Sequence, residues 1–178
     1  MTHEKVMRAP LPPENLLFEG KSYDLGWNGA RTPSSVSQSD PPVLPSADFA
    51  MYLINAVKFH CGQLFHLFDE EKFMQEFSAF QEDPTQLTQT PSLWYIHYLL
   101  ILAFGKAFVV QNSKGRKPPG AELFVHAMTL LPEFAFYGAD PIEAIQVLCC
   151  AALYLQCLDF RGAAYRMVRS LLMLHRAA

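Results

Sequence analysis

The chain has 178 residues, 51% of them hydrophobic, and its formal net charge at pH 7 is −3. This length suffices for one domain with a real core and is too short for two well-packed domains. The weak negative charge argues against docking of this chain on DNA or on an anionic membrane, because either needs a concentrated basic surface.

The four cysteines do not form the pattern of a disulfide scaffold. Cys149, Cys150 and Cys157 crowd into one apolar helical stretch, and Cys61 lies far from them in the sequence. Cysteines in such a stretch usually pack as small hydrophobic residues. We therefore expect buried thiols in a reducing, intracellular compartment.

Neither a signal peptide nor a membrane span is expected. The proline-rich start contains no continuous apolar segment. Of the two most apolar stretches, residues 93–110 are broken by His97 and Lys106. Residues 147–155 make up only about half of the roughly 20 residues that a helix needs to cross a bilayer. Both stretches predict buried core helices.

Residues 1–45 hold most of the 13 prolines together with a Ser-, Gly- and Asn-rich run. Such a segment cannot bury enough apolar surface to offset its ordering entropy, so its composition predicts a flexible linker. Leu16, Leu17 and Phe18 form a small apolar group within it. This group indicates either a patch that packs on the domain or a short motif that binds a partner.

From Ser46 onward the apolar residues recur at helical spacing, which predicts a helical domain over residues 46–178. Pro45, Ser46 and Asp48 signal the start of the first helix. Its predicted inner face consists of Phe49, Tyr52, Leu53, Ala56, Val57 and His60.

The second helix has the clearest start signal of the chain. Asp69 is its predicted N-cap, and Glu70 and Glu71 follow where the helix dipole favours carboxylates. Phe68 and Phe73 occupy the two positions of a hydrophobic staple. The predicted inner stripe is Phe73, Phe77 and Phe80.

Two further helices flank a loop at residues 112–120. Thr90 and Pro91 predict the start of a third helix, with the proline at its first position. This helix is apolar on nearly every side, which places it in the middle of a bundle. The loop is expected to be a solvated surface loop, since a nucleic-acid patch would need more charge and interleaved aromatics. A fourth helix over residues 121–131 turns Phe124, Ala127, Met128 and Leu131 inward.

Asp140, Pro141 and Glu143 have the form of a capping box with proline at the first helical position. They predict a fifth helix whose inner residues are Ile145, Leu148, Ala152 and Leu155. A break at residues 159–162 precedes a last helix carrying Ala164, Tyr165, Val168, Leu171 and Leu172. No convincing strand pattern occurs. The predicted fold is all-α, an irregular array of about six helices.

The sequence gives little support for a metal-binding or catalytic site. His60, Cys61 and His66 lack the second ligand pair that structural zinc requires. Asp69, Glu70 and Glu71 could begin a magnesium site of an all-α enzyme, but no later helix offers a facing acidic cluster. Helix capping explains the three acids, and no nucleophile elbow or phosphate-binding loop is present. We expect that the chain is not an enzyme and binds no cofactor or metal.

Four segments follow one another in a fixed order: QLFHLFDEEKF at residues 63–73, ILAFGKA at 101–107, DPIEAIQVL at 140–148 and LHR at 174–176. Together they resemble the regulatory middle homology domain of fungal zinc-cluster transcription factors. The resemblance covers about residues 44–176. Gln146 and the Leu-His-Arg ending carry most of its weight.

Three departures from the family pattern stand out. Met173 replaces the usual glycine before Leu-His-Arg, the interval between Ala164 and Leu174 is short, and the chain stops where the family domain continues. The six-cysteine zinc cluster that reads DNA in this family is not among these residues. A helical array cut short would leave an apolar end face, which predicts self-association or marginal stability.

The resemblance implies the regulatory region of a nuclear fungal transcription factor, controlled by protein partners or a small-molecule effector and reaching DNA only through a separate zinc-cluster domain. Two alternatives stay open: a free-standing helical adaptor that acts by protein association, and, more distantly, the all-α enzyme. For an effector we expect a pocket between the third and fifth helices, where aromatic walls could meet a few polar tips. Its residues would be Trp94, His97, Phe104 and Tyr154.

Overall fold

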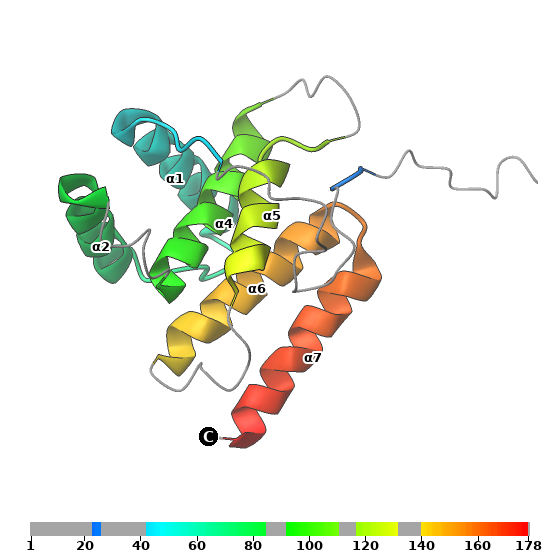
Figure 1. The fold of residues 1–178 in the computed structure, drawn as a ribbon. Coiled ribbons are helices and arrows are strands. Elements are labelled where there is room, and N and C mark those ends of the chain that lie inside the picture. Colours follow the sequence, from blue (N-terminus) through cyan, green and yellow to red (C-terminus); the bar gives the residue numbers. More distant parts are fainter. Residues whose placement is uncertain (1–22, 26–41, 85–91, 111–116, 132–139, 178) are drawn as a thin grey trace, which may run out of the picture.

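The structure is a computed structural model that describes residues 23–25, 42–84, 92–110, 117–131 and 140–177, with side chains described up to Arg169. These residues form six α-helices and no strand (Figure 1). The predicted all-α class is therefore confirmed. The helices are α1 (Ala47–Cys61), α2 (Glu70–Glu82), α4 (Leu93–Val109), α5 (Ala121–Leu130), α6 (Pro141–Cys157) and α7 (Arg161–Ala177).

Helix α4 lies at the centre of the array. α1, α5 and α6 pack against it, and α7 packs against α6 at the outside (Figure 1). Every residue from Trp94 to Gly105 is buried, as the all-round apolar sequence of this helix predicts. Such a helix needs neighbours on all sides, so the array is organised around it.

Short polar side chains cap the N-termini of four of the helices. Ser46, Asp69, Ser92 and Asp140 each accept a hydrogen bond from the backbone N–H three residues later, at 3.4, 3.2, 3.1 and 3.0 Å. Each bond satisfies an N–H group that the first helical turn leaves without a partner. The predicted caps Asp69 and Asp140 are confirmed. Helix α4 is capped by Ser92 and starts at Leu93, so the prediction that Pro91 is its first residue is wrong.

At two glycines, the missing side chain lets another segment of the backbone lie close to the central helix α4. A Cβ atom on Gly105 would lie 2.6 Å from Cβ of Leu53 and 2.7 Å from its carbonyl oxygen, so α1 and α4 touch at this point. Gly120 has φ 82° before α5, and a Cβ there would lie 2.5 Å from the carbonyl oxygen of Ala103. Residues with a side chain rarely adopt this left-handed conformation.

Helix α2 attaches to α4 through aromatic rings. Phe73 packs against Trp94 with ring centroids 5.7 Å apart, and Phe80 packs against Tyr98 at 5.5 Å. The Trp94 Nε1–H donates a hydrogen bond of 3.3 Å to the Phe73 carbonyl oxygen. The predicted stripe of Phe73, Phe77 and Phe80 is buried, and the predicted staple is present, with the Phe68 and Phe73 rings 4.6 Å apart.

The inner face of α1 is rotated from the predicted one. Leu53 and Val57 are buried as expected, but Phe49, Tyr52 and His60 are exposed. Ala50, Ile54 and Cys61 are buried instead. This helix carries apolar residues on more than one side, so their spacing did not settle which side faces α4. The contact between Leu53 and Gly105 sets the rotation.

Ile145, an expected inner residue of α6, is exposed, and so are Tyr165 and Val168 of the predicted last helix. Leu148, Ala152, Leu155 and Ala164 are buried as predicted. Helix α7 packs mainly on one neighbour, α6, so only a narrow stripe with Ala164 and Met167 is covered. Leu171 and Leu172, also named for this helix, lie beyond the side chains that the structure describes.

The prediction that the three cysteines of the α6 stretch are buried is wrong for two of them. Cys61 and Cys150 are buried, whereas Cys149 and Cys157 are exposed, and all four are free thiols. Cys149 and Cys157 do not belong to the buried residues of α6, which include Cys150.

Most of the predicted linker lies outside the described residues. Within it, Leu25 is only 4% exposed and belongs to the core, so the chain contacts the helical array at this point. Among the described residues, no helix combines the length and the apolar character that a membrane crossing requires.

Candidate functional site

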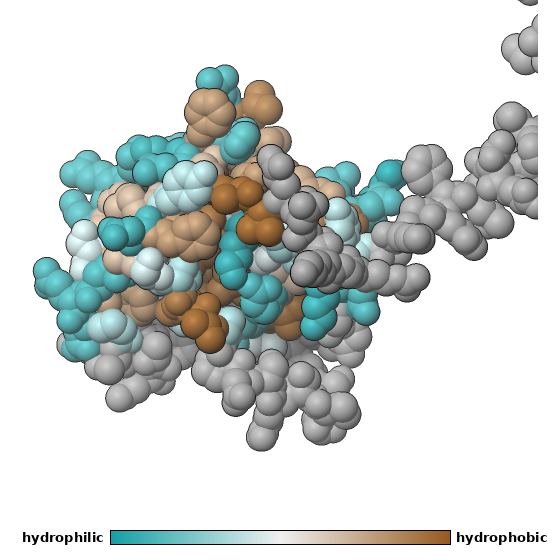
Figure 2. All heavy atoms as spheres, turned by 90° about the horizontal axis from the view of Figure 1, so that it is seen from above, coloured by the Kyte–Doolittle hydropathy of each residue, from teal (hydrophilic) through white to brown (hydrophobic). Residues whose placement is uncertain are grey.

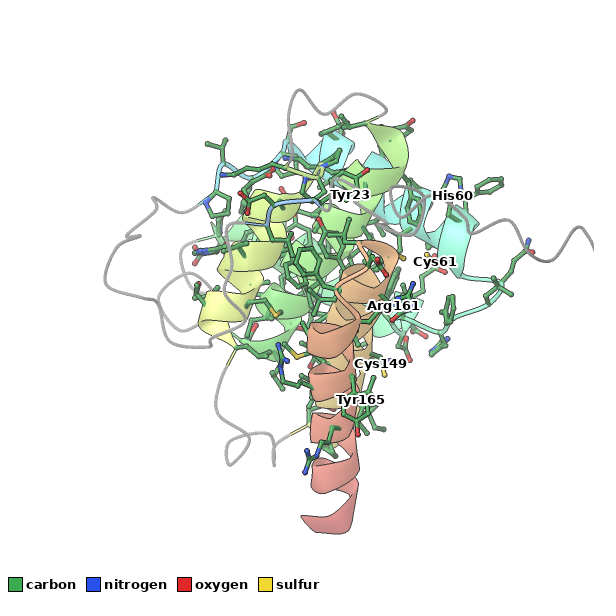
Figure 3. All side chains as sticks on the ribbon, turned by 90° about the vertical axis from the view of Figure 1, so that its right-hand side faces the viewer. Tyr23, His60, Cys61, Cys149, Arg161 and Tyr165 are labelled. Carbon is green, nitrogen blue, oxygen red and sulfur yellow. The ribbon has the colours of Figure 1, made fainter. Side chains whose placement is uncertain are left out.

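An open apolar groove of about 640 Å³ lies between α6, α7 and the segment that joins α1 to α2. Its exposed walls include Leu64, which is 79% exposed, and Tyr165, which is 67% exposed. Figure 3 shows Arg161, Cys149 and Tyr165 following one another along α6 and α7. The lining comes from residues 64–67, from Cys149, Ala152, Leu153 and Gln156 of α6, and from Arg161, Ala164, Tyr165 and Val168 of α7.

Few polar groups line the groove, and two of them have defined surroundings. The Arg161 Nε–H donates a hydrogen bond of 2.6 Å to Oδ1 of Asp159, which lies in the turn before α7 with φ 64°. Partial burial raises the pKa of the Cys149 thiol. A raised pKa leaves little thiolate at neutral pH, so this thiol is not an activated nucleophile. The groove therefore suits binding of an apolar group better than chemistry.

Residues 65–67 also form a wall of a second hollow of about 350 Å³, which includes Val57, Phe59 and Cys61 of α1. An ion pair between Lys58 and Glu70 joins α1 to α2 across this hollow. Residues 65–67, which lie between α1 and α2, therefore separate the groove from this second hollow. Other apolar side chains also reach the surface among polar ones, as the view in Figure 2 shows.

His97 of α4 connects the segment at residues 65–67 to the core. This side chain is 1% exposed, and one of its ring nitrogens hydrogen-bonds to the backbone of Leu67. Its Nε2 has no partner among the described residues, so Nδ1 is the nitrogen that donates to the Leu67 carbonyl oxygen. Burial lowers the pKa of His97 to about 4, which keeps the ring neutral at physiological pH.

The unpartnered Nε2 of His97 borders a cavity of about 10 Å³, close to the size of one water molecule. Lys72 of α2 and Glu143 of α6 line the same cavity. The Lys72 Nζ lies 2.5 Å from Asp140 Oδ2 and 3.5 Å from Glu143 Oε2, so it ties α2 to the first turn of α6.

The pKa values of the carboxyl groups around Lys72 are shifted in opposite directions. The Glu143 backbone N–H and the Lys72 ammonium lower the pKa of Asp140. Burial raises the pKa of Glu143 and of Glu76 more than the ammonium lowers them. In the predicted capping box, Asp140 caps α6 as expected, while the Glu143 carboxylate contacts Lys72.

The four residues of the predicted effector pocket fall into two pairs. Trp94 and His97 both contact Phe73 beneath α2. At the α5 end, Phe104 packs edge-on against Tyr154 at 5.3 Å, and the Tyr154 hydroxyl donates a hydrogen bond of 3.3 Å to the Pro119 carbonyl oxygen. All four side chains are buried. A pocket at these residues stays a prediction, and it would require the aromatic core to open.

The acidic residues at the start of α2 have structural partners. Asp69 caps the helix and Glu70 pairs with Lys58. Within the described ranges, no three histidine, cysteine or acidic side chains gather as metal ligands would. Asp69 has the capping role that the sequence predicts, and the ion pair of Glu70 is an additional feature of the structure.

The groove was not identified from the sequence, because Tyr165 and Val168 continue the apolar spacing of Ala164 and that spacing does not show which residues are covered. Two signals point to it in retrospect. The helix at residues 161–177 has more apolar positions than one neighbour can cover. Leu64 and Phe65 lie in the non-helical segment after α1, where an apolar side chain has no helical face to pack into.

The architecture is that of an all-helical domain with an open apolar groove at its surface. The family model described as the fungal specific transcription factor domain matches residues 51–178, which is more than half of the chain. The chain therefore belongs to the family of fungal specific transcription factor domains. The resemblance in the sequence is confirmed. Comparisons with curated proteins and with solved structures find no match.

Membership in this family makes the chain a fungal transcription factor regulatory region. Domains of this family are generally not enzymes, and zinc belongs to a separate DNA-binding domain. The groove and the ion pairs described above are thus features of a regulatory domain.

Proposed function

We propose that the helical domain at residues 46–178 controls transcription by binding a protein partner in the groove between α6 and α7. The observation that carries this proposal is the exposed apolar wall of Leu64, Phe65, Tyr165 and Val168 on a domain of this family. Aromatic side chains at the surface are typical of protein contacts, because they bury a large area on binding.

In this proposal, DNA is contacted by a separate zinc-cluster domain and the protein acts in the nucleus. The helical domain supplies the regulatory contacts, and residues 1–45 link it to its neighbour. Two features support the assignment of DNA binding to a separate domain. The net charge of the chain is −3, which disfavours direct DNA binding, and the four cysteines lie on α1 and α6 at spacings unlike those of a zinc cluster.

A small-molecule effector is a second candidate for the same groove. The groove volume of about 640 Å³ lies within the range of roughly 300–1,000 Å³ that is usual for small-molecule sites. Arg161 and His66 offer polar tips on otherwise apolar walls. An effector of this kind would be an apolar molecule carrying an acidic group.

The experiment is a transcription assay with a fusion protein. The 178 residues are joined to an unrelated DNA-binding domain, and reporter transcription in fungal cells is compared with that of the DNA-binding domain alone. We expect the fused chain to change transcription several-fold in either direction. A fusion that is expressed, nuclear and bound to the promoter, yet leaves transcription unchanged, would contradict the proposal.

A further inference from the structure

We propose that the groove between α6 and α7 is a docking site for a segment of this same chain, residues 14–19, with Leu16, Leu17 and Phe18 inserted between its walls. The segment then competes with the partner for the groove. This regulatory consequence rests on the proposed function, whereas the docking itself does not. The sequence of the segment is Glu-Asn-Leu-Leu-Phe-Glu.

The chain reaches the helical array next to the groove. Leu25 is buried in the core and so anchors the N-terminal part of the chain. Figures 1 and 3 both place residues 23–25 beside the turn that joins α6 to α7. Arg161, at the start of α7, lines the groove at this turn, so a segment that precedes Tyr23 starts from one end of the groove.

The length of chain fits the length of the groove. Phe18 precedes Tyr23 by five positions, and five extended residue steps span up to about 17 Å. On α7 the groove runs from Arg161 to Val168, a rise of about 10 Å along the helix axis. Leu16, Leu17 and Phe18 can therefore reach the groove walls while Leu25 stays in the core.

The chemistry of the segment matches the groove. Leu16, Leu17 and Phe18 are the only run of three hydrophobic residues within positions 1–45. Acidic residues, Glu14 and Glu19, flank the run. Helix α7 contains no acidic residue and carries exposed arginines, with Arg161 paired to Asp159. An apolar insert with acidic ends thus meets apolar walls beside basic side chains.

Cys149 provides a direct test, because it lines the groove and is exposed. In the full chain, Cys157→Ser removes the other exposed thiol, and Leu17→Cys places a thiol in the segment. A mild chemical oxidant such as diamide takes up two electrons and two protons as the thiols join in a disulfide. The rate is followed in dilute protein by non-reducing electrophoresis, and the bond is located by peptide mass.

The matched control adds Leu16→Ser and Phe18→Ser to the same protein. It keeps the tether length and the thiol position and removes the apolar contacts. A flexible tether alone brings the two thiols together equally often in both proteins. Docking predicts that the 17–149 disulfide forms within one chain at least about tenfold faster in the protein that keeps Leu16 and Phe18.

Equal rates in the two proteins would overturn the proposal. Disulfide-linked dimers as the main product would also overturn it, because the groove would then be filled by a second copy. These outcomes leave the transcription assay untouched, so failure of the docking and failure of the proposed function are distinguishable. If both hold, Leu16→Ser with Phe18→Ser strengthens the effect of the fused chain on the reporter.

Discussion

His97 of the central helix donates a hydrogen bond to the backbone of Leu67, in the segment that separates the two surface hollows. This bond connects the buried core to a wall of the groove. It also gives a role to a histidine that the sequence places on an otherwise apolar helix. The shape of the groove therefore depends on a residue that lies outside it.

Replacing His97 with leucine should destabilise the domain by about 1–3 kcal/mol, because the Leu67 carbonyl group loses a buried donor. The free energy of unfolding is measured by urea denaturation. Backbone hydrogen exchange at residues 64–68 should become faster than that of α4. His60→Leu is the control, since His60 is exposed and stacks on Phe108. Similar losses in the two variants would refute this role of His97.

The stability of the domain should fall as the pH decreases from about 6.5 towards 4. The pKa of His97 is about 4 in the folded state and about 6.5 in the unfolded chain, so the unfolded chain binds more protons in this range. Protonation therefore favours unfolding, by up to about 3 kcal/mol at the acidic end. Glu143 borders the same cavity, and because burial raises its pKa it adds a pH dependence of its own at the acidic end.

The variant His97→Leu isolates the histidine contribution to this pH dependence. The difference in unfolding free energy between the wild type and the variant should shrink as the pH falls from 7 to 4.5. A difference that is constant over this range would show that His97 does not titrate as its burial requires.

Lys72→Met should weaken the attachment of α2 to α6, because Asp140 and Glu143 lose their shared cation. Lys72 is half exposed, so solvent screening limits the expected loss to about 1 kcal/mol. The urea midpoints of both proteins are compared at low and at high salt. The loss should decrease at high salt, and a loss that is independent of salt would contradict an ionic origin.

Gly105→Ala should destabilise the domain by about 1–3 kcal/mol, because the new methyl group would collide with the backbone of Leu53. Gly162→Ala is the matched control. It lies in α7, where a Cβ atom meets nothing closer than 3.8 Å, so alanine should stabilise the helix by up to about 1 kcal/mol. Thermal unfolding measures both effects. Equal shifts of Tm would show that α1 and α4 are not in close contact.

Local signals in the sequence were sufficient to predict most of the helices. Asp69 and Asp140 were identified because a cap depends on residues within one turn. The central position of α4 followed from its apolar sequence, which only a fully covered helix tolerates. The boundary between a linker at residues 1–45 and a domain at 46–178 stays a prediction.

Features that depend on tertiary packing were harder to predict. The rotation of α1 is set by the contact of Leu53 with Gly105, two residues far apart in the sequence. The groove arises because α7 packs mainly on one helix and leaves Tyr165 uncovered, which no periodicity within α7 reveals. The four residues named for an effector pocket are buried in the core, and a pocket at these residues stays a prediction.

The most direct test of the account compares two tyrosine variants in the fusion protein. Tyr165→Glu places a charge in the groove, and Tyr52→Glu places one on an exposed part of α1 that does not line it. Both proteins should fold, because both side chains point to solvent. We predict that Tyr165→Glu abolishes the effect of the chain on reporter transcription and that Tyr52→Glu preserves it. Equal transcription from the two variants would contradict a regulatory role for the groove.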